Sequence, residues 1–345
     1  MRTDVGTKPA AAFRKHSMIR YPFETPPPAG EAITVAPGVL WLRLPLPMAL
    51  DHVNVYALDD GDSWTIIDTG FNTSKTRGQW QDLMAGPLAG KPVARVVVTH
   101  HHPDHYGLSG FFEGLGARVF LHEEEFARGH RFWREPEAFA EASWRLFLDH
   151  GTPEGALQGI RETVEKTRER VHPPQNPLPL RDGEALEVAG KRLRVLWTPG
   201  HADGHAAFYL EEEGVLLAGD ALLEKVSPNV GLWAYTRENP LKDFLRSLDR
   251  LADLGARVAY AGHFGPIADV RQRAEELKAH HQARLEALLA LLDGPKTAWE
   301  LSLHLFPQEL DPAGRRFAFA ETLAHLEYLR EEGAVGRGGP PYRYF

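Results

Sequence analysis

The sequence contains no cysteine among its 345 residues. This absence excludes disulfide bonds, a cysteine nucleophile and a thiolate ligand to a metal. Long apolar runs are missing as well, since none reaches the roughly 18 residues that indicate a membrane-spanning helix. The N-terminal residues also lack the apolar segment of a signal peptide. We therefore expect a cytoplasmic protein that does not enter a membrane.

Positive charge is scarce too, because 39 Lys and Arg stand against 47 Asp and Glu, for a formal net charge of −8. A surface that binds nucleic acid through its phosphates needs clustered positive charge. From residue 283 to residue 345, nine acidic residues outnumber seven basic ones. We therefore expect a small molecule as the substrate and no nucleic-acid partner, and we leave a homodimer open.

The strongest positive feature is the run Thr-His-His-His-Pro-Asp-His at 99–105, which directly follows three valines. On an extended segment, side chains two residues apart point the same way, so His100 and His102 can reach one ion together. Asp104 and His105 follow a proline that ends the extended run, and they turn toward a second position. Imidazole and carboxylate groups are ligands for zinc, and also for iron or manganese. A merely solvated histidine cluster fits poorly, because this run is internal and follows a buried-strand pattern.

Four further segments share one design, in which a short apolar run precedes a small-residue turn and a polar residue. The polar residues are Asp68, His201, Asp220 and His263. Each apolar run has the length and character of a central strand. Layered α/β folds gather their sites at the carboxyl ends of such strands. We therefore expect these four side chains to meet the 99–105 run.

With these motifs, the chain resembles the metallo-beta-lactamase superfamily. The family motif His-x-His-x-Asp-His and the three later family ligands all have counterparts in the expected order, at His100, His102, Asp104, His105, His201, Asp220 and His263. The resemblance implies an α/β fold built as a four-layer αββα sandwich. It also implies two divalent transition metal ions as cofactors, with zinc as the first choice and iron or manganese as alternatives.

The resemblance assigns the ligands to two ions. The first ion would be bound by His100, His102 and His201, and the second by Asp104, His105 and His263, with Asp220 bridging both. Asp104 and Asp220 are therefore the candidate catalytic residues.

Three more residues are candidates for contacts around the ligands. Asp68 would accept the N–H of a ligand imidazole and so fix its tautomer, although a simple turn residue is the alternative. His205 either supports the site and its pocket or only holds its own loop. Tyr235 lies in the loop 221–237 that follows Asp220, where its phenol either donates to an oxyanion or packs on the core.

Two ions about 3.5–4 Å apart can share a water, lower its pKa toward neutrality and polarise a substrate oxygen. The resemblance thus implies a dinuclear metal-dependent hydrolase in which a metal-bridging hydroxide attacks a small-molecule ester, with a thioester as the leading case. The absence of cysteine separates the chain from those β-lactamases of the family that use a cysteine ligand. A phosphodiesterase or ribonuclease of the same fold is one alternative, and a non-catalytic nucleic-acid-binding protein is another. The acidic balance weighs against both of them, and the full ligand set weighs against the second.

We divide the chain into a flexible N-terminal arm at 1–30, a metallo-beta-lactamase-like catalytic domain at 31–292 and a winged-helix-like domain at 293–345. Within the catalytic domain, residues from about 123 to 172 have helical spacing and indicate an insertion that covers the metal cleft. Six large apolar residues form a stripe in it: Phe132, Trp133, Phe139, Trp144, Phe147 and Leu148. A stripe at helical spacing favours packing over a binding pocket.

The remaining patterns predict individual elements. The residues 33–44 predict two strands around a turn, 52–58 predict a third strand and 172–180 predict a proline-rich connector. Helices are predicted at 76–83, from 107 onward, at 267–292, at 297–305 with Thr297 as its cap, and at 316–332.

Overall fold

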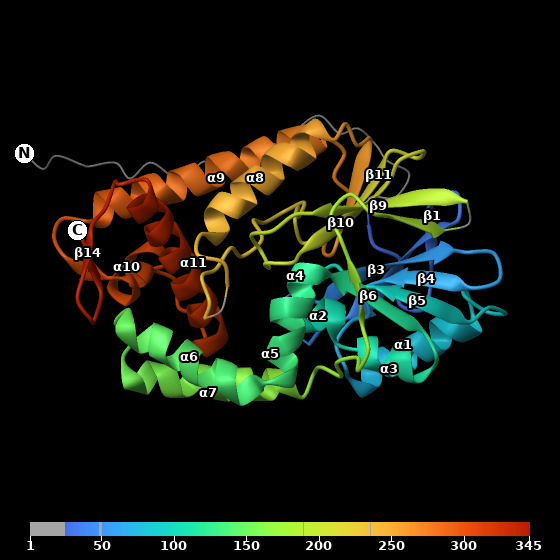
Figure 1. Cartoon of the computed structure of the whole chain (residues 1–345), viewed down its shortest axis with the longest axis horizontal. Helices are drawn as coiled ribbons and strands as arrows, with labels where there is room; N and C mark the ends of the chain where they lie inside the picture. The colour runs from blue at the N-terminus through green and yellow to red at the C-terminus, as the bar shows by residue number, and fades with distance from the viewer. Residues whose placement is uncertain (1–24, 48–49, 189, 235) are drawn as a thin grey trace, which may run out of the picture.

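The computed structural model describes residues 25–345, except 48, 49, 189 and 235. Two β-sheets pack face to face, and helices cover the outer face of each sheet (Figure 1). The chain therefore forms the four-layer αββα sandwich that the sequence predicts. Most of the predicted N-terminal arm, at 1–24, lies outside the described residues.

The first sheet has seven strands, which follow one another in chain order from β1 to β7. The first four strands are antiparallel neighbours, and the pairs from β4 to β7 are parallel. Its strands are β1 (Ile33–Ala36), β2 (Val39–Pro45), β3 (His52–Asp59), β4 (Trp64–Ile67), β5 (Val93–Val97), β6 (Arg118–His122) and β7 (Leu178–Leu180).

The second sheet has five strands in the order β12-β11-β10-β9-β8. Only β11 and β12 pair in parallel, because helix α8 connects them, and the other neighbours are antiparallel. Its strands are β8 (Ala185–Val188), β9 (Lys191–Trp197), β10 (Ala206–Leu210), β11 (Val215–Gly219) and β12 (Val258–Ala261).

Aromatic side chains fill the layer between the two sheets. Trp41 and Tyr56 of the first sheet pack on Tyr260 of the second, with ring centroids 5.8 and 6.3 Å apart. The Tyr56 hydroxyl donates to the Ala261 carbonyl at 2.6 Å, which satisfies a polar group that burial would otherwise penalise. These contacts fix β3 against β12, and the start of β3 and the end of β12 lie close to the polar residues described below.

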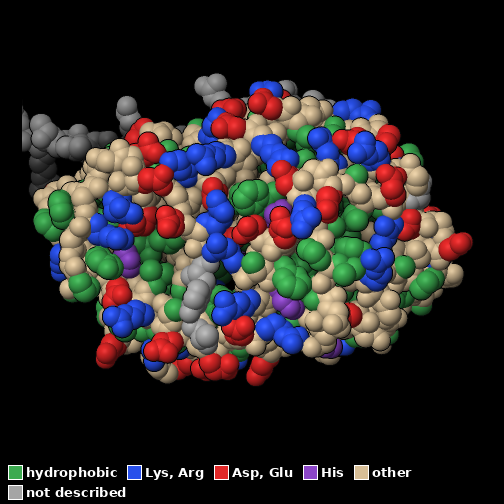
Figure 2. Space-filling model, in the orientation of Figure 1, with side chains coloured by type: hydrophobic (Ala, Val, Ile, Leu, Met, Phe, Trp, Pro, Cys, Tyr) green, Lys and Arg blue, Asp and Glu red, His purple; other side chains and the backbone are tan. Residues whose placement is uncertain are grey.

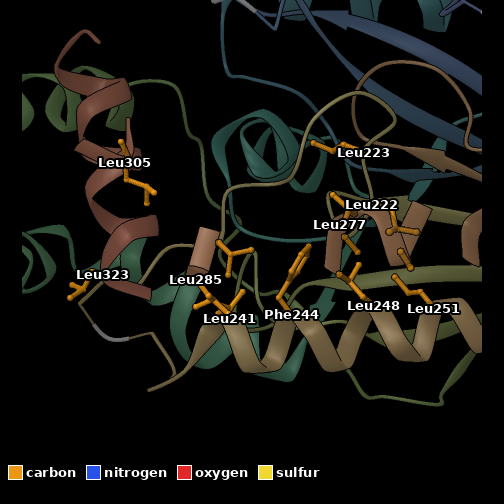
Figure 3. Packing of buried hydrophobic residues seen from close by; sticks show 14 of the residues in the cluster. Leu222, Leu223, Leu241, Phe244, Leu248, Leu251, Leu277, Leu285, Leu305 and Leu323 are labelled. Carbon is orange, nitrogen blue, oxygen red and sulfur yellow. The ribbon is translucent and has the colours of Figure 1, made fainter. Parts of the chain in front are cut away.

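Helices α1 (Ser74–Ala85) and α3 (Ser109–Gly114) cover the outer face of the first sheet, where Trp80 packs edge-on against Phe112 at 4.9 Å. Helices α8 (Pro240–Asp253) and α9 (Val270–Leu291) cover the second sheet. Leu241, Phe244, Leu248 and Leu251 recur on one face of α8 and pack toward Leu277 of α9, as Figure 3 shows. The periodicity of apolar residues on α8 is that of a helix with one buried face.

The predicted insertion is helical along most of its length. Its helices are α4 (Glu123–Glu125), a π-helical turn (Phe126–His130), α5 (Arg131–Arg134), α6 (Pro136–Asp149) and α7 (Glu154–Arg168). Phe139 and Phe147 are buried, as the packing interpretation of the stripe predicts, whereas Leu148 is exposed. Trp133 differs, because its indole N–H donates to the His101 carbonyl at 2.8 Å within the metal-ligand motif.

The C-terminal residues form two helices and a small sheet, namely α10 (Ala298–Leu305), α11 (Pro312–Glu331), β13 (Lys296–Thr297), β14 (Arg337–Gly338) and β15 (Arg343–Tyr344). Thr297 caps α10 as predicted, and Glu300 completes a reciprocal capping box. Leu305 and Leu323 belong to the same hydrophobic cluster as the leucines of α8 (Figure 3). The C-terminal helices thus share a core with the sandwich. Their identity as a winged helix stays a prediction.

The insertion and the C-terminal helices also contact each other directly. Phe147 of α6 packs on Phe319 of α11, with ring centroids 4.6 Å apart. The Tyr342 N–H donates to the Asp149 carbonyl at 2.6 Å. The insertion therefore spans from the 99–105 turn at one end to the C-terminal helices at the other (Figure 1).

Several elements differ from the sequence predictions, which did not include strands β6, β8 and β10. Residues 172–180 were predicted as a connector, yet Leu178–Leu180 form the edge strand β7, where a proline is tolerated because one side of the strand needs no partner. Helix α8 was not predicted, although its apolar spacing carries the signal.

Within the described residues, no helix combines the length and the apolar character that crossing a membrane requires.

Candidate metal centre

The predicted ligands lie at one edge of the sandwich, beyond the ends of five strands. The 99–105 turn follows β5, Asp68 follows β4, and His201 lies in the turn after β9. Asp220 and His263 follow the parallel neighbours β11 and β12. Because the strands end at the same edge, residues as far apart in sequence as Asp104 and His263 come within a few ångströms of one another.

Three imidazoles form the first group, His100, His102 and His201. Their ligand nitrogens lie within 4.8 Å of one another. Nε2 of His100 and Nδ1 of His102 are 2.9 Å apart, and the rings of His102 and His201 lie edge to face at 4.5 Å. This is the set that the resemblance assigns to the first ion.

The second group consists of Asp104, His105 and His263, whose ligand atoms also lie within 4.8 Å of one another. Oδ2 of Asp104 is 3.3 Å from Nε2 of His263 and 3.7 Å from Nε2 of His105. One carboxylate and two imidazoles therefore face one small volume, which matches the set assigned to the second ion.

Asp220 lies between the two groups. Its Oδ1 is 3.4 Å from Nε2 of His105, and its Oδ2 is 3.5 Å from Nε2 of His263. The same Oδ2 is 3.6 Å from Nε2 of His201 in the first group. A single carboxylate thus contacts ligands of both groups, which is the geometry that a bridging ligand requires.

Contacts behind the ligands fix which nitrogen of each imidazole carries its proton. His201 donates from Nδ1 to the Asn229 carbonyl at 2.8 Å, and His263 donates from Nδ1 to the His52 carbonyl at 2.9 Å. His105 donates from Nδ1 to Oδ2 of Asp68 at 2.7 Å. In each case the hydrogen bond leaves Nε2 with a lone pair for a cation, and such outer contacts raise the affinity of a metal site.

Asp68 therefore makes the contact that the sequence analysis predicts for it. Its carboxylate accepts three hydrogen bonds, from the Thr99 N–H, the Thr99 hydroxyl and His105 Nδ1. Since the Thr99 hydroxyl donates to Asp68, its oxygen accepts from Nδ1 of His100 at 2.9 Å. Asp68 and Thr99 thus orient one imidazole of each group.

We predict that Asp68→Asn lowers the zinc affinity of the second group by about 10–100-fold. The amide can still accept from the Thr99 N–H, but its NH₂ would face two donors, the Thr99 hydroxyl and His105 Nδ1. Backbone strain does not confound the test, because Asp68 has φ of 64° and asparagine tolerates this conformation. Competition titration against a chromogenic chelator measures the affinity.

Asp59→Asn is the matched control for this change, because Asp59 lies on the same sheet and binds Lys91 at 2.6 Å, away from the metal ligands. Unchanged zinc binding by Asp68→Asn would contradict the role of Asp68 in orienting His105.

His205 supports the site without joining the ligand groups. Its Nε2 accepts the backbone N–H of Asp220 at 3.0 Å, and its Nδ1 donates to the Thr198 hydroxyl at 2.8 Å. Both ring nitrogens are therefore engaged, and the ring is fully buried. Of the two interpretations that the sequence left open, the structure favours a side chain that fixes the backbone of Asp220. Tyr235, the remaining pocket candidate, lies outside the described residues.

The electrostatics of the cluster suit cations. Burial and the neighbouring imidazoles hold the pKa values of His100 and His102 well below the ordinary value, so both rings are neutral. Burial opposes the ionisation of Asp220, but His263 and His105 outweigh it and hold the pKa of this carboxyl well below its usual range. Burial alone would lower the pKa of His263, yet Asp220 and Asp104 raise it to about 10. The buried negative charge thus attracts positive charge to this position.

The donor set also fits a pair of divalent ions. Nε2 of His105, Nε2 of His201 and Oδ1 of Asp220 are buried and have no hydrogen-bond partner among the residues that the structure describes. Burying a polar atom without a partner costs roughly 1–3 kcal/mol, and a pair of divalent cations, one in each group, would satisfy all three atoms. In the described residues, the ion pairs of Asp104 and Asp220 involve only histidines. Gly262 leaves room beside the cluster, since a Cβ there would stand 2.6 Å from Cε1 of His105.

Sequence reasoning missed several residues that shape the site. Thr99, Thr198 and Asn229 hold Asp68, His205 and His201, and no local sequence pattern distinguishes them from other turn residues. Glu125 of the insertion is buried, with Oε2 2.9 Å from Nδ1 of His101. His101 therefore points away from the ligand groups, as the alternation in the motif predicts.

Comparisons with known proteins agree with this geometry. The model of the metallo-beta-lactamase superfamily matches residues 48–263, and the model of a metallo-beta-lactamase-like C-terminal domain matches residues 285–340. A crystal structure of a metallo-beta-lactamase family protein from Thermus thermophilus is 80% identical, with a TM-score of 0.84, and the match covers 90% of this chain and 99% of that one.

Two curated relatives are similar as well. A probable metallo-hydrolase, YqjP of Bacillus subtilis, is 32% identical over 86% of this chain and 93% of its own length. An atrochrysone carboxyl ACP thioesterase of Aspergillus fumigatus is 27% identical over 72% of this chain and 62% of its own length.

The chain belongs to the metallo-beta-lactamase superfamily. Within that superfamily it is a metallo-hydrolase that carries the additional C-terminal domain.

Proposed function

We propose that the protein is a dinuclear metal-dependent hydrolase of small-molecule esters, with thioesters as the first substrate class. The observation that carries this proposal is the position of Asp220, which contacts His201 of the first group and both histidines of the second. A single-ion site would not need a carboxylate in this position.

Two divalent ions in these groups would supply a water of lowered pKa and a Lewis acid for the substrate oxygen. The chain holds the ligands so that little reorganisation is needed, because an outer hydrogen bond at Nδ1 locks one tautomer in each of four imidazoles, namely His100, His105, His201 and His263. The carboxylate of Asp104 is 16% exposed, against 8% for Asp220, so Asp104 is the more accessible of the two. We assign to Asp104 the acceptance of a proton during hydrolysis.

The insertion packs against the ligand motif on the side that His101 faces. Phe132 packs on His101, with ring centroids 6.2 Å apart, and Trp133 holds the His101 backbone. Aromatic side chains beside the ligand motif exclude water and offer an apolar surface to an acyl chain. This arrangement supports an ester or thioester with an apolar acyl part.

Two observations favour thioesters over the phosphodiesters of nucleic acid. A relative is named an acyl-carrier-protein thioesterase. Two cations of the C-terminal domain, Arg330 and Arg337, are also engaged, since Glu327 binds both. On the face shown in Figure 2, basic and acidic side chains are interspersed among the described residues, and no broad basic area covers it.

A substrate screen on protein of measured metal content tests the proposal. We expect about two equivalents of transition metal and hydrolysis of an acyl thioester with a kcat/KM at least about tenfold above that of an aryl phosphodiester. A lactone serves as the oxygen-ester comparison, and chelator-treated protein serves as the control. Cleavage of the phosphodiester in preference to the thioester would overturn the substrate class.

A further inference from the structure

The loop between β11 and α8 connects the metal centre to the C-terminal domain. It begins at the ligand Asp220 and runs beside α11 (Figure 1). The Leu232 N–H donates to the Ala320 carbonyl at 3.0 Å, so backbone joins backbone across the two segments. A Cβ at Gly231 would stand 3.0 Å from Cβ of Ala320, which shows how closely the loop lies on the helix.

A second contact in this loop reaches a ligand. The Asn229 side-chain amide donates to Oε2 of Glu321 at 3.1 Å, and it also lies 3.4 Å from the Phe317 carbonyl. The backbone carbonyl of the same Asn229 accepts Nδ1 of His201 at 2.8 Å. Glu321 is therefore separated from the first ligand group by a single residue.

Burying the carboxyl group of Glu321 costs folding free energy, so its retention points to a needed hydrogen bond. Its side chain is only 12% exposed, and Arg284 lies 3.9 Å away, beyond a hydrogen bond. Burial raises the pKa of Glu321 to about 6, against the influence of Arg284 and Asn229. A buried carboxyl group is retained where its hydrogen bond matters, because an apolar residue would pack at lower cost.

Arg316 of α11 holds the same loop at Trp233. Its guanidinium lies over the ring of Trp233 at 5.1 Å and over the ring of Phe317 at 4.8 Å. The loop is thus fixed on α11 through a backbone bond, an amide–carboxyl bond and a cation–π contact. These three contacts, at Asn229, Leu232 and Trp233, restrict the position of the Asn229 carbonyl.

We propose that Glu321 is a positioning residue for the metal centre, and that through Asn229 it sets the metal affinity of the His100, His102 and His201 group. The C-terminal domain is then part of the metal centre rather than an appended module. This inference rests on the proposed metal site but not on the identity of the substrate.

Zinc competition titrations of the full chain test the proposal. Glu321→Ala removes the nearer acceptor of the Asn229 amide and leaves only the Phe317 carbonyl at 3.4 Å, so we expect the affinity of the first group to fall by about 10–100-fold, the usual effect of losing an outer contact. Glu321→Gln keeps an acceptor oxygen and is expected to stay within about threefold of the parent. Asn229→Ala keeps the backbone carbonyl but loses the tether, and it is expected to match Glu321→Ala.

Glu327→Gln is the matched control on the same helix. Glu327 is also buried, but it binds Tyr344, Arg330 and Arg337 on the side of the small sheet. We expect this variant to lower thermal stability and to bind zinc like the parent. An equal loss of zinc affinity in Glu327→Gln and Glu321→Ala would overturn the proposal, because it would show a general loosening of the domain.

Double variants, in which Glu321→Ala is combined with the loss of one metal ligand, show which ligand group Glu321 affects. With His263→Ala, the first group remains intact, and Glu321→Ala should still weaken zinc binding. With His201→Ala, the contact to Asn229 is gone, and Glu321→Ala should have no further effect. Unchanged zinc affinity of Glu321→Ala in the His263→Ala background would overturn the proposal. A parent that binds one zinc would instead contradict the dinuclear function, and the His201-dependent effect of Glu321 would remain measurable.

Discussion

Asp220→Ala is expected to lower kcat/KM for hydrolysis by at least about 1,000-fold and to reduce the bound metal from about two equivalents to one or fewer. Asp220 contacts His105, His201 and His263, so its loss removes a ligand from both groups at once. Metal ions contribute several kcal/mol to transition-state stabilisation, and about 1.4 kcal/mol corresponds to a factor of ten in rate. Metal analysis and steady-state kinetics on the same preparation measure both effects.

The control for this change is Asp249→Ala on α8, which removes a carboxylate that binds Lys278 at 2.6 Å on the surface. Circular dichroism should show that both variants keep the fold, because Asp220 is not part of the apolar core. Parental metal content and parental hydrolysis in Asp220→Ala would refute the role of Asp220 as the bridging ligand.

Trp80→Ala is expected to destabilise the protein by about 3–5 kcal/mol. Trp80 is fully buried on α1, packs edge-on against Phe112 and donates its indole N–H to the Thr69 carbonyl at 2.8 Å. The substitution leaves a cavity and an unpaired carbonyl. Trp80→Phe keeps a ring but loses the hydrogen bond, so it is expected to cost less, about 1–3 kcal/mol.

Urea unfolding in the presence of a chelator measures these losses without the contribution of bound metal. Leu115→Ala is the control, because Leu115 lies just after α3 and is 59% exposed.

Thr69 accepts from Trp80 and donates twice to the His105 carbonyl, from its N–H at 2.7 Å and its hydroxyl at 2.9 Å. Trp80→Ala should therefore also weaken zinc binding at the second group. If Trp80→Ala resists urea as well as the parent does, the packing and hydrogen bond of Trp80 do not contribute to stability.

The sequence was sufficient to predict the strands that carry the ligands, because each is a short apolar run before a turn. The alternation in 99–105 also predicted that His101 would point away from His100 and His102, as it does. Helix α8 was not predicted, even though Leu241, Phe244, Leu248 and Leu251 have helical spacing. This helical spacing is a local pattern, so α8 could have been predicted from the sequence. Strand β7 was harder, because Pro179 argues against a strand unless the edge position is known.

The role of His205 cannot be predicted from local sequence patterns. Its sequence position, four residues after His201, is compatible with a ligand, a pocket residue or a structural histidine. The choice depends on the Asp220 backbone and the Thr198 hydroxyl, which the fold brings to its two nitrogens. The same holds for Asn229, whose backbone carbonyl is a group that every residue has.

By itself, the sequence determined the residue types of the candidate ligands and their order along the chain, because strand periodicity and histidine spacing are local properties, and the family resemblance of these motifs implied the fold class. The tertiary structure alone decided that Asp220 lies between both ligand groups, that Asp68 and Thr99 orient one imidazole of each, and that α11 holds the loop behind His201. These contacts join segments far apart in the chain, so they depend on how the sheets and helices pack rather than on any local pattern.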